Sequence, residues 1–105
     1  MTNELPAKIY KRIKCLCGEG DRCLELNNFE GALEKYRKAW ELVPDDKIDW
    51  EASTWILASA GEVYFRQQRH VEALDRFLRA IQCPAGPGNP FIHLRLGQLH
   101  FELGD

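Results

Sequence analysis

Internal repetition is the feature of this chain that most restricts its fold. The segment 31–40 returns at 71–81 with the same order of residue types: alanine, leucine, an aromatic residue four places after the alanine, and a second alanine three places further on. These residues are Ala32, Leu33, Tyr36 and Ala39 in the first copy, and Ala73, Leu74, Phe77 and Ala80 in the second. Small residues let one helix approach its neighbour closely, and the aromatic ring fills the space between them. Such a unit buries its apolar face against the next unit, so the sequence predicts a stacked helical repeat.

Glycines mark a helix that precedes each copy. Gly20 and Gly61 each lie twelve residues before the leading alanine of a copy, and Gly97 has a matching context. A residue that breaks the pattern follows each glycine by seven places: Asn27, Gln68 and Gly104. Asparagine or glycine at such a turn tolerates the left-handed conformation that ends a helix. The repeating unit is therefore predicted to be helix, tight turn, helix, with turns at 27–30 and 68–71.

The unit resembles the tetratricopeptide repeat (TPR) family, whose signature has Leu-Gly or Ala-Gly, a later Tyr, then Ala-x3-Phe/Tyr and a closing Pro. The second copy matches at Leu57, Ala60, Gly61, Tyr64, Ala73, Phe77, Ala80 and Pro84. The first copy matches in its second helix, at Ala32, Tyr36, Ala39 and Pro44, and departs in its first, where Glu19 and Cys23 replace apolar residues. A third, half unit holds Leu96, Gly97, His100 and Gly104. The resemblance covers about residues 12–105 and implies an all-α, TPR-like superhelix of antiparallel helix pairs, about two and a half repeats long.

The glycine spacing predicts where the helices lie. It is 41 residues in the first interval and 36 in the second. We assign the longer interval to extra helical turns at 47–54, with Asp45 and Asp46 as the N-cap region. Asn89 as N-cap and Pro90 at the first helical position end the loop 83–90. The expected helices are 5–26, 29–43, 46–67, 70–82 and 90–103, in a single domain (1–105) made of repeat 1 (about 7–44), repeat 2 (about 46–84) and half repeat 3 (about 89–105). The middle helix is apolar on most of its circumference, so we expect contacts from more than one side.

Charge and hydropathy narrow the classes of partner. The formal net charge is −2, and acidic and basic residues are interspersed, so no positive surface for nucleic acid is expected. No apolar run approaches the roughly 18 residues that a membrane-spanning helix requires. The N-terminus, Met1–Glu4, lacks the build of a signal peptide. We expect a cytoplasmic protein that binds neither nucleic acid nor membrane, with thiols at Cys15, Cys17, Cys23 and Cys83.

Catalysis and metal binding are not predicted. Cys15 and Cys17 are two residues apart, and on a helix such residues point in different directions. His93 and His100 share one helix face, but the sequence offers no obvious carboxylate or cysteine to complete a site. We therefore expect no enzyme activity, no metal and no cofactor.

The resemblance to TPR proteins implies a binding groove, because in that family the first helix of each pair lines a concave surface that holds the ligand. Carried over by spacing, the candidate groove residues are Leu24, Trp55, Glu62, Phe65, Arg66, Phe91, Leu94, Arg95, Gln98 and Phe101. We expect a protein or peptide partner, anchored by the apolar residues and paired with the arginines at the rim. Some family members clamp a terminal carboxylate with Lys and Asn at groove positions that hold Cys17, Asp21, Ser59 and Phe91 here, so that mode is not expected.

Two alternatives to such an adaptor stay open. Segments 50–58 and 89–98 resemble small bacterial repeat proteins, some of which are similar to immunity partners of secreted toxins, so one alternative is a dedicated toxin inhibitor. The other is a self-assembly domain whose apolar groove is filled by another copy. The chain stops where a family member would begin the partner of the fifth helix, and we favour a fragment of a longer protein. Leu96, Leu99 and Leu103 are then expected to lack cover and to cause self-association.

Overall fold

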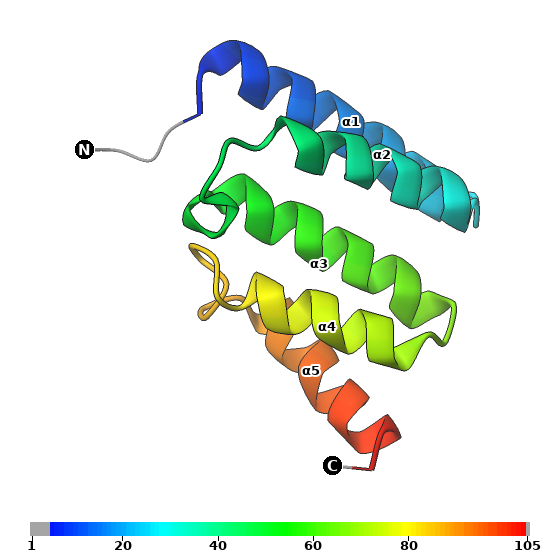
Figure 1. The fold of residues 1–105 in the computed structure, drawn as a ribbon. Helices are drawn as coiled ribbons and strands as arrows, with labels where there is room; N and C mark the ends of the chain where they lie inside the picture. Colours follow the sequence, from blue (N-terminus) through cyan, green and yellow to red (C-terminus); the bar gives the residue numbers. More distant parts are fainter. Residues whose placement is uncertain (1–4, 105) are drawn as a thin grey trace.

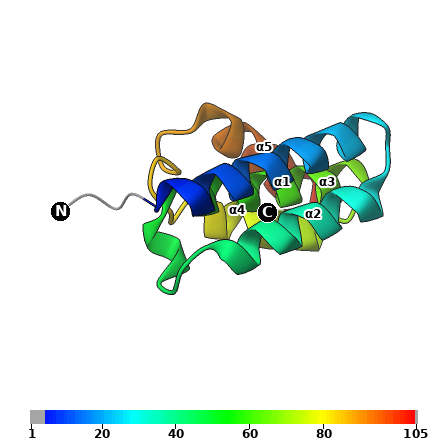
Figure 2. The same cartoon turned by 90° about the horizontal axis from the view of Figure 1, so that it is seen from above.

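The chain folds into helices alone within residues 5–104, the range that the computed structural model describes. The helices are α1 (Ala7–Glu25), α2 (Phe29–Leu42), α3 (Glu51–Arg66), α4 (His70–Ala80) and α5 (Pro90–Glu102), with a 3-10 turn, η1 (Lys47–Asp49), before α3. They stack in chain order, with α1 and α2 at one end and α5 at the other (Figure 1). Seen from above, α2 and the beginning of α5 lie at opposite edges of the stack (Figure 2). The predicted all-α class is confirmed, and all five predicted helices are present.

Each break residue predicted from the glycine spacing ends a helix in the left-handed conformation. The φ angles are 58° at Asn27, 61° at Gln68 and 81° at Gly104. This conformation is strained for a side chain other than asparagine or glycine, so Gln68 is the least expected of the three. The backbone turns sharply at the first two positions and sends α2 and α4 back along α1 and α3 (Figure 1).

Asparagine side chains begin two of the helices. The Asn28 side chain accepts a hydrogen bond from the Gly31 amide at 3.0 Å, which caps α2. The Asn89 side chain accepts from the amides of Phe91 at 2.9 Å and Ile92 at 3.2 Å. Pro90 occupies the first turn of α5, where its missing N–H costs nothing. The predicted start of the fifth helix is confirmed.

The predicted helix 46–67 is wrong in its first turn, because α3 begins only at Glu51. Asp46 is left-handed, with a φ of 62°, and neither Asp45 nor Asp46 caps a helix with its side chain. Lys47 explains the difference: its ammonium donates to the carbonyl oxygens of Trp40, at 2.9 Å, and Val43 at the end of α2. The segment that was predicted to extend α3 therefore closes the end of α2 instead.

The helices associate as two antiparallel pairs, α1 with α2 and α3 with α4, each closed by a ring packed on a glycine. A Cβ atom placed on Gly20 would lie 2.6 Å from the Tyr36 ring, and one on Gly61 would lie 2.9 Å from the Phe77 ring. Both rings are fully buried. A side chain at either position would therefore force the ring that joins the pair to shift.

The core consists of two clusters that share α3. Ile56 and Val63 of α3 pack with the buried side chains of α1 and α2, while Leu57 packs with those of α4 and α5. Trp40 contacts both clusters. The prediction that the middle helix is contacted from more than one side is confirmed, and this double burial accounts for its apolar composition.

Candidate functional site

A groove of about 470 Å³ lies between α1, α3 and the beginning of α5. We call it the central groove. Its lining residues come from α1, α3 and α5, from the loop before α5 and, in α2, from Tyr36. They are Asp21, Leu24, Tyr36, Glu51, Thr54, Trp55, Ala58, Ser59, Glu62, Ala85, Asn89 and Phe91. Trp55 is half-buried and Phe91 is exposed. Aromatic side chains such as these two are enriched at protein interfaces, whereas carboxylates are depleted there.

The floor of the central groove is fixed by a hydrogen bond between the first two helices. The Tyr36 hydroxyl donates to the Asp21 carboxylate at 2.5 Å. Burial, followed by this bond to a carboxylate, raises the pKa of Tyr36, so the phenol stays protonated and keeps donating. The buried Tyr36 side chain therefore fixes the orientation of the Asp21 carboxylate at the wall of the central groove.

An ion cluster around Glu62 marks the end of the central groove and links α3 to α5. The Glu62 carboxylate accepts from Arg95 at 2.7 and 3.1 Å and from Arg66 at 3.0 Å. The exposed fractions of the Glu62 and Arg95 side chains are 10% and 19%. Burial favours the neutral acid, but the hydrogen bonds and charges of the two arginines outweigh it and lower the pKa of Glu62. The Arg95 guanidinium also lies over the rings of Phe65, at 4.4 Å, and Phe91, at 5.0 Å.

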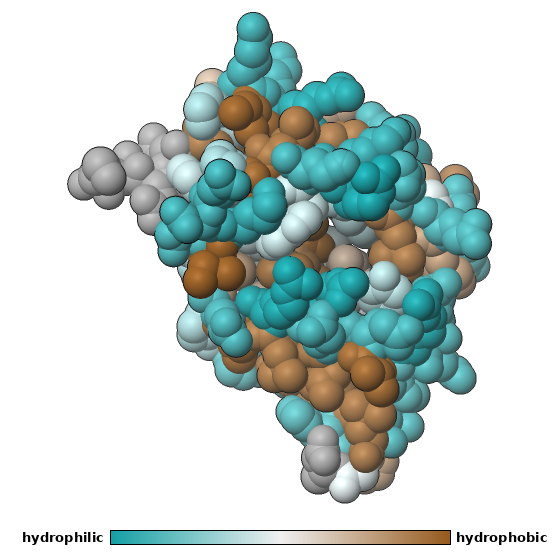
Figure 3. Space-filling view, viewed as in Figure 1, coloured by the Kyte–Doolittle hydropathy of each residue, from teal (hydrophilic) through white to brown (hydrophobic). Residues whose placement is uncertain are grey.

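A second recess, of about 790 Å³, lies beyond this cluster, between the α3–α4 turn and α5. We call it the α5 recess. It is lined by Phe65, Arg66, Gln68, His70, His93, Leu94, Gly97, Gln98, Phe101 and Glu102. Leu94 is 56% exposed and Phe101 is 82% exposed, among the most exposed large apolar residues of the described chain. Figure 3 shows apolar surface gathered over α4 and α5 at this end of the molecule.

The predicted groove residues therefore divide between two adjoining sites. Leu24, Trp55, Glu62 and Phe91 line the central groove. Phe65, Arg66, Leu94, Gln98 and Phe101 line the α5 recess. Arg95 lies between them, and its guanidinium donates to Glu62 and, at 2.8 Å, to Gln98, so it holds α5 against α3. Leu24 is buried, so it contributes to the groove wall more than to free surface.

The prediction that Leu96, Leu99 and Leu103 lack cover is wrong for the first two. Leu96 and Leu99 are buried in the cluster that α5 forms with α3 and α4. The prediction failed because α5 turns the face that carries Leu96 and Leu99 toward α3 and α4. The side chains of Leu94 and Phe101 are directed outward instead. Leu103, in the turn after α5, is partly exposed.

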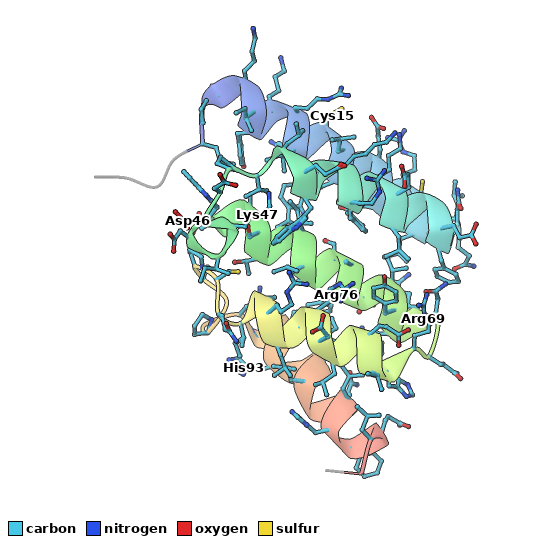
Figure 4. The ribbon with its side chains drawn as sticks, in the orientation of Figure 1. Cys15, Asp46, Lys47, Arg69, Arg76 and His93 are labelled. Atoms are coloured by element: carbon cyan, nitrogen blue, oxygen red, sulfur yellow. The ribbon has the colours of Figure 1, made fainter. Side chains whose placement is uncertain are left out.

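A third hollow, of about 430 Å³, was not predicted from the sequence. It lies on the side formed by α2, α3 and α4 and includes Trp40, Tyr64, Arg76 and Arg79. The guanidinium of Arg76 lies 5.3 Å from the Tyr64 ring, and that of Arg79 lies 5.6 Å from the Trp40 ring. Figure 4 shows Arg69 and Arg76 near the α3–α4 pair, where Arg69 also stacks on Tyr64 at 4.7 Å. Arg76 and Arg79, three residues apart in α4, were the available sequence signal.

The four cysteines are free thiols, and burial raises the pKa of Cys17 to about 12, so this thiol stays protonated. No group of three His, Cys, Asp or Glu side chains within residues 5–104 is arranged to hold a metal ion. In the same range, every helix is too short or too polar to cross a membrane.

No family model, no curated protein and no solved structure matches this chain.

Proposed function

We propose that this chain is a non-catalytic protein-interaction module that binds a protein or peptide segment in the central groove. The observation that carries the proposal is the groove between α1, α3 and α5, with Trp55 and Phe91 in its lining and carboxylates at Asp21 and Glu62. Aromatic side chains in such a setting supply most of the binding energy of a protein interface. The paired helices, each closed by a ring on a glycine, support the further proposal of a TPR-like superhelix.

The charges of the groove indicate what kind of segment fits it. The Glu62 carboxylate is already paired with Arg66 and Arg95, while Asp21 accepts a hydrogen bond from a neutral hydroxyl. Asp21 thus remains a negative charge that a basic side chain of the partner can approach. We infer an amphipathic segment with apolar residues opposite Trp55 and Phe91 and a lysine or arginine opposite Asp21. The four free thiols are compatible with a reducing compartment, and we place the module in the cytoplasm.

The proposal is tested by affinity capture with variants of the groove aromatics. Phe91→Ala should lose one dominant partner, with a decrease in binding free energy of about 2 kcal/mol for a true anchor residue. Tyr10→Ala is the matched control, because Tyr10 is an aromatic residue of similar exposure that lines neither the central groove nor the α5 recess. Trp55→Ala is measured for both capture and melting temperature, since Trp55 also packs against the core. Equal capture by wild type, Phe91→Ala and Tyr10→Ala would contradict the proposal.

A further inference from the structure

The hollow of about 430 Å³ between α2 and α4 lies on the other side of α3 from the central groove. We call it the arginine hollow. Its floor includes Leu57, Ala60 and Tyr64, which are spaced to share one face of α3. Trp55 and Glu62, seven residues apart on a different face, line the central groove. In Figure 3 hydrophilic side chains surround a recess on the side of α2 and α4.

A cation stacked on an aromatic ring marks each end of the arginine hollow. At one end the Lys47 ammonium lies 5.3 Å from the centre of the Trp40 ring and donates to the Trp40 carbonyl oxygen at 2.9 Å. At the other end the Arg69 guanidinium lies 4.7 Å from the centre of the Tyr64 ring. Figure 4 shows Lys47 and Arg69 at opposite ends of α3, with Arg76 between them. A polypeptide segment that passes along a groove needs both ends open, so this shape favours a compact ligand.

The α4 wall of the arginine hollow carries a positive charge with free hydrogen-bond donors. Arg76 donates from Nη1 to the Asp75 carboxylate, which leaves its Nε and Nη2 groups without an acceptor in residues 5–104. The Arg79 guanidinium lies 3.8 Å from the same carboxylate and forms no hydrogen bond within that range. The nearby Glu72 is already paired with Arg69 at 2.8 Å. Because guanidinium groups bind carboxylates through paired N–H donors, this wall fits one further carboxylate.

The α2 wall restricts the charge of the ligand. Glu34 is paired with Arg37 at 2.6 Å, and Arg37 also binds Glu41 at 2.7 Å. Glu30, which lines the same wall, has no ion pair within residues 5–104, so the wall is negative. No ion pair in that range crosses the hollow from α2 to α4. A polyanion would bring a second negative charge against these glutamates, whereas a monoanion bound to the α4 wall would not.

The floor of the arginine hollow is apolar and aromatic. It includes Leu33, Ile56 and Leu57, together with the partly buried rings of Trp40 and Tyr64. An ion pair with exposed arginines contributes little by itself, so the ligand must also bury apolar surface on this floor. The volume of the hollow falls within the range of about 300–1,000 Å³ that is typical of small-molecule sites. A carboxylate on a small apolar body satisfies the floor and both walls.

We propose that the arginine hollow binds a small monocarboxylate whose body is aromatic or branched aliphatic. The carboxylate lies against the guanidiniums of Arg76 and Arg79, and the apolar body lies on Trp40 and Tyr64. This site goes beyond the proposed binding of a protein segment in the central groove, because Tyr36 is the one residue that lines both sites.

A titration with 3-phenylpropionate tests the proposal on the full chain. Backbone amide shifts in the nuclear magnetic resonance spectrum report binding, and we expect saturable shifts at the residues that line the hollow in α3 and α4. Acetate has the charge without the body, and 3-phenylpropionamide has the body without the charge. Each should bind at least about tenfold more weakly than the probe. Benzylmalonate, which adds a second carboxylate, should also bind more weakly because of the glutamates of α2.

Arginine substitutions identify the wall that holds the carboxylate. Arg76→Gln and Arg79→Gln should each weaken binding of 3-phenylpropionate by at least about fivefold, because glutamine keeps much of the side-chain length and removes the charge. Arg22→Gln is the matched control, since Arg22 is an exposed arginine of α1 that lines none of the three hollows. This variant should bind like wild type. Circular dichroism confirms that the three variants are folded.

Three results would overturn the inference. The first is the absence of saturable shifts at the lining of the hollow in folded wild type, and the second is equal binding by wild type and Arg79→Gln. The third is tighter binding of the capped tripeptide phenylalanyl-glutamyl-phenylalanine amide than of 3-phenylpropionate, which would assign the hollow to a polypeptide segment. Arg79→Gln leaves the residues of the central groove unchanged, so the groove proposal stands or fails separately on the capture by Phe91→Ala.

Discussion

Replacement of helical glycines by alanine should have opposite effects on stability at positions that look alike in the sequence. Alanine in a helix interior is favoured over glycine by about 0.8–1.0 kcal/mol. At Gly18 and Gly97 a Cβ atom meets nothing within 4 Å, so the full gain is expected. We therefore predict that Gly18→Ala and Gly97→Ala each raise the free energy of unfolding by about 1 kcal/mol.

At Gly20 the same substitution meets the buried Tyr36 ring. The added Cβ atom would lie 2.6 Å from Cε1 of Tyr36, whose ring is fully buried and whose hydroxyl is bonded to Asp21 at 2.5 Å. Insertion of an extra carbon into a packed core costs about 1–3 kcal/mol. After the helix-propensity gain is subtracted, Gly20→Ala should lower the free energy of unfolding by up to about 2 kcal/mol. Gly61→Ala should follow it with a smaller loss, because the Phe77 ring has no hydrogen bond to break.

Urea unfolding followed by far-ultraviolet circular dichroism measures these changes from the shift of the midpoint at constant slope. Gly18 and Gly20 lie two residues apart in α1, so the comparison of their alanine variants removes most effects of helix propensity. The expected difference of roughly 1–3 kcal/mol is above the error of the method. A stabilising Gly20→Ala, or a Gly97→Ala as destabilising as Gly20→Ala, would refute the argument that rings close the two pairs and leave α5 uncovered.

Two further predictions concern Glu62 and the cysteines. Glu62→Gln should lower the free energy of unfolding by about 1.5–3 kcal/mol near pH 7, because it leaves the half-buried Arg95 without its carboxylate. The arginines hold the folded pKa of Glu62 below its ordinary value of 4.5, so the advantage of wild type is complete above that value and is lost as the pH falls through the folded pKa. Urea titrations at several pH values measure this, and an advantage that grows toward acid pH would contradict it. With a thiol reagent followed by mass spectrometry, exposed Cys15 should react at once, whereas buried Cys17, whose pKa is raised to about 12, should react only as the protein unfolds. Equal rates at the two positions would show that α1 opens readily.

The helices were predictable because their signals are local. Asn27 can adopt the left-handed turn by its own chemistry, and Asn89 followed by Pro90 caps a helix without help from distant residues. The segment 45–50 was mispredicted because its conformation depends on Lys47, which binds carbonyl oxygens at the end of the preceding helix. That contact joins two elements, and acidic residues before a helix give no sign of it.

The candidate site was predictable in part for the same reason. The spacing of residues on a helix indicates which of them share a face. It therefore predicted groove positions for Trp55 and Phe91, which line the central groove, and for Leu94 and Phe101, which line the α5 recess. It does not indicate which neighbour covers that face. Leu96 was therefore expected on the surface and is buried. Arg95 was expected to meet a partner, although its donors are engaged by Glu62 and Gln98.

Gly97 shows most clearly what repetition leaves open. In the sequence it is the third member of a series with Gly20 and Gly61. The repeat therefore predicts that Gly97 also leaves space for a neighbouring side chain. The structure shows that two of these spaces contain a ring and that no ring of residues 5–104 lies in the third. The energetic consequence follows from that difference: a side chain is costly where the ring is present and favourable where it is absent.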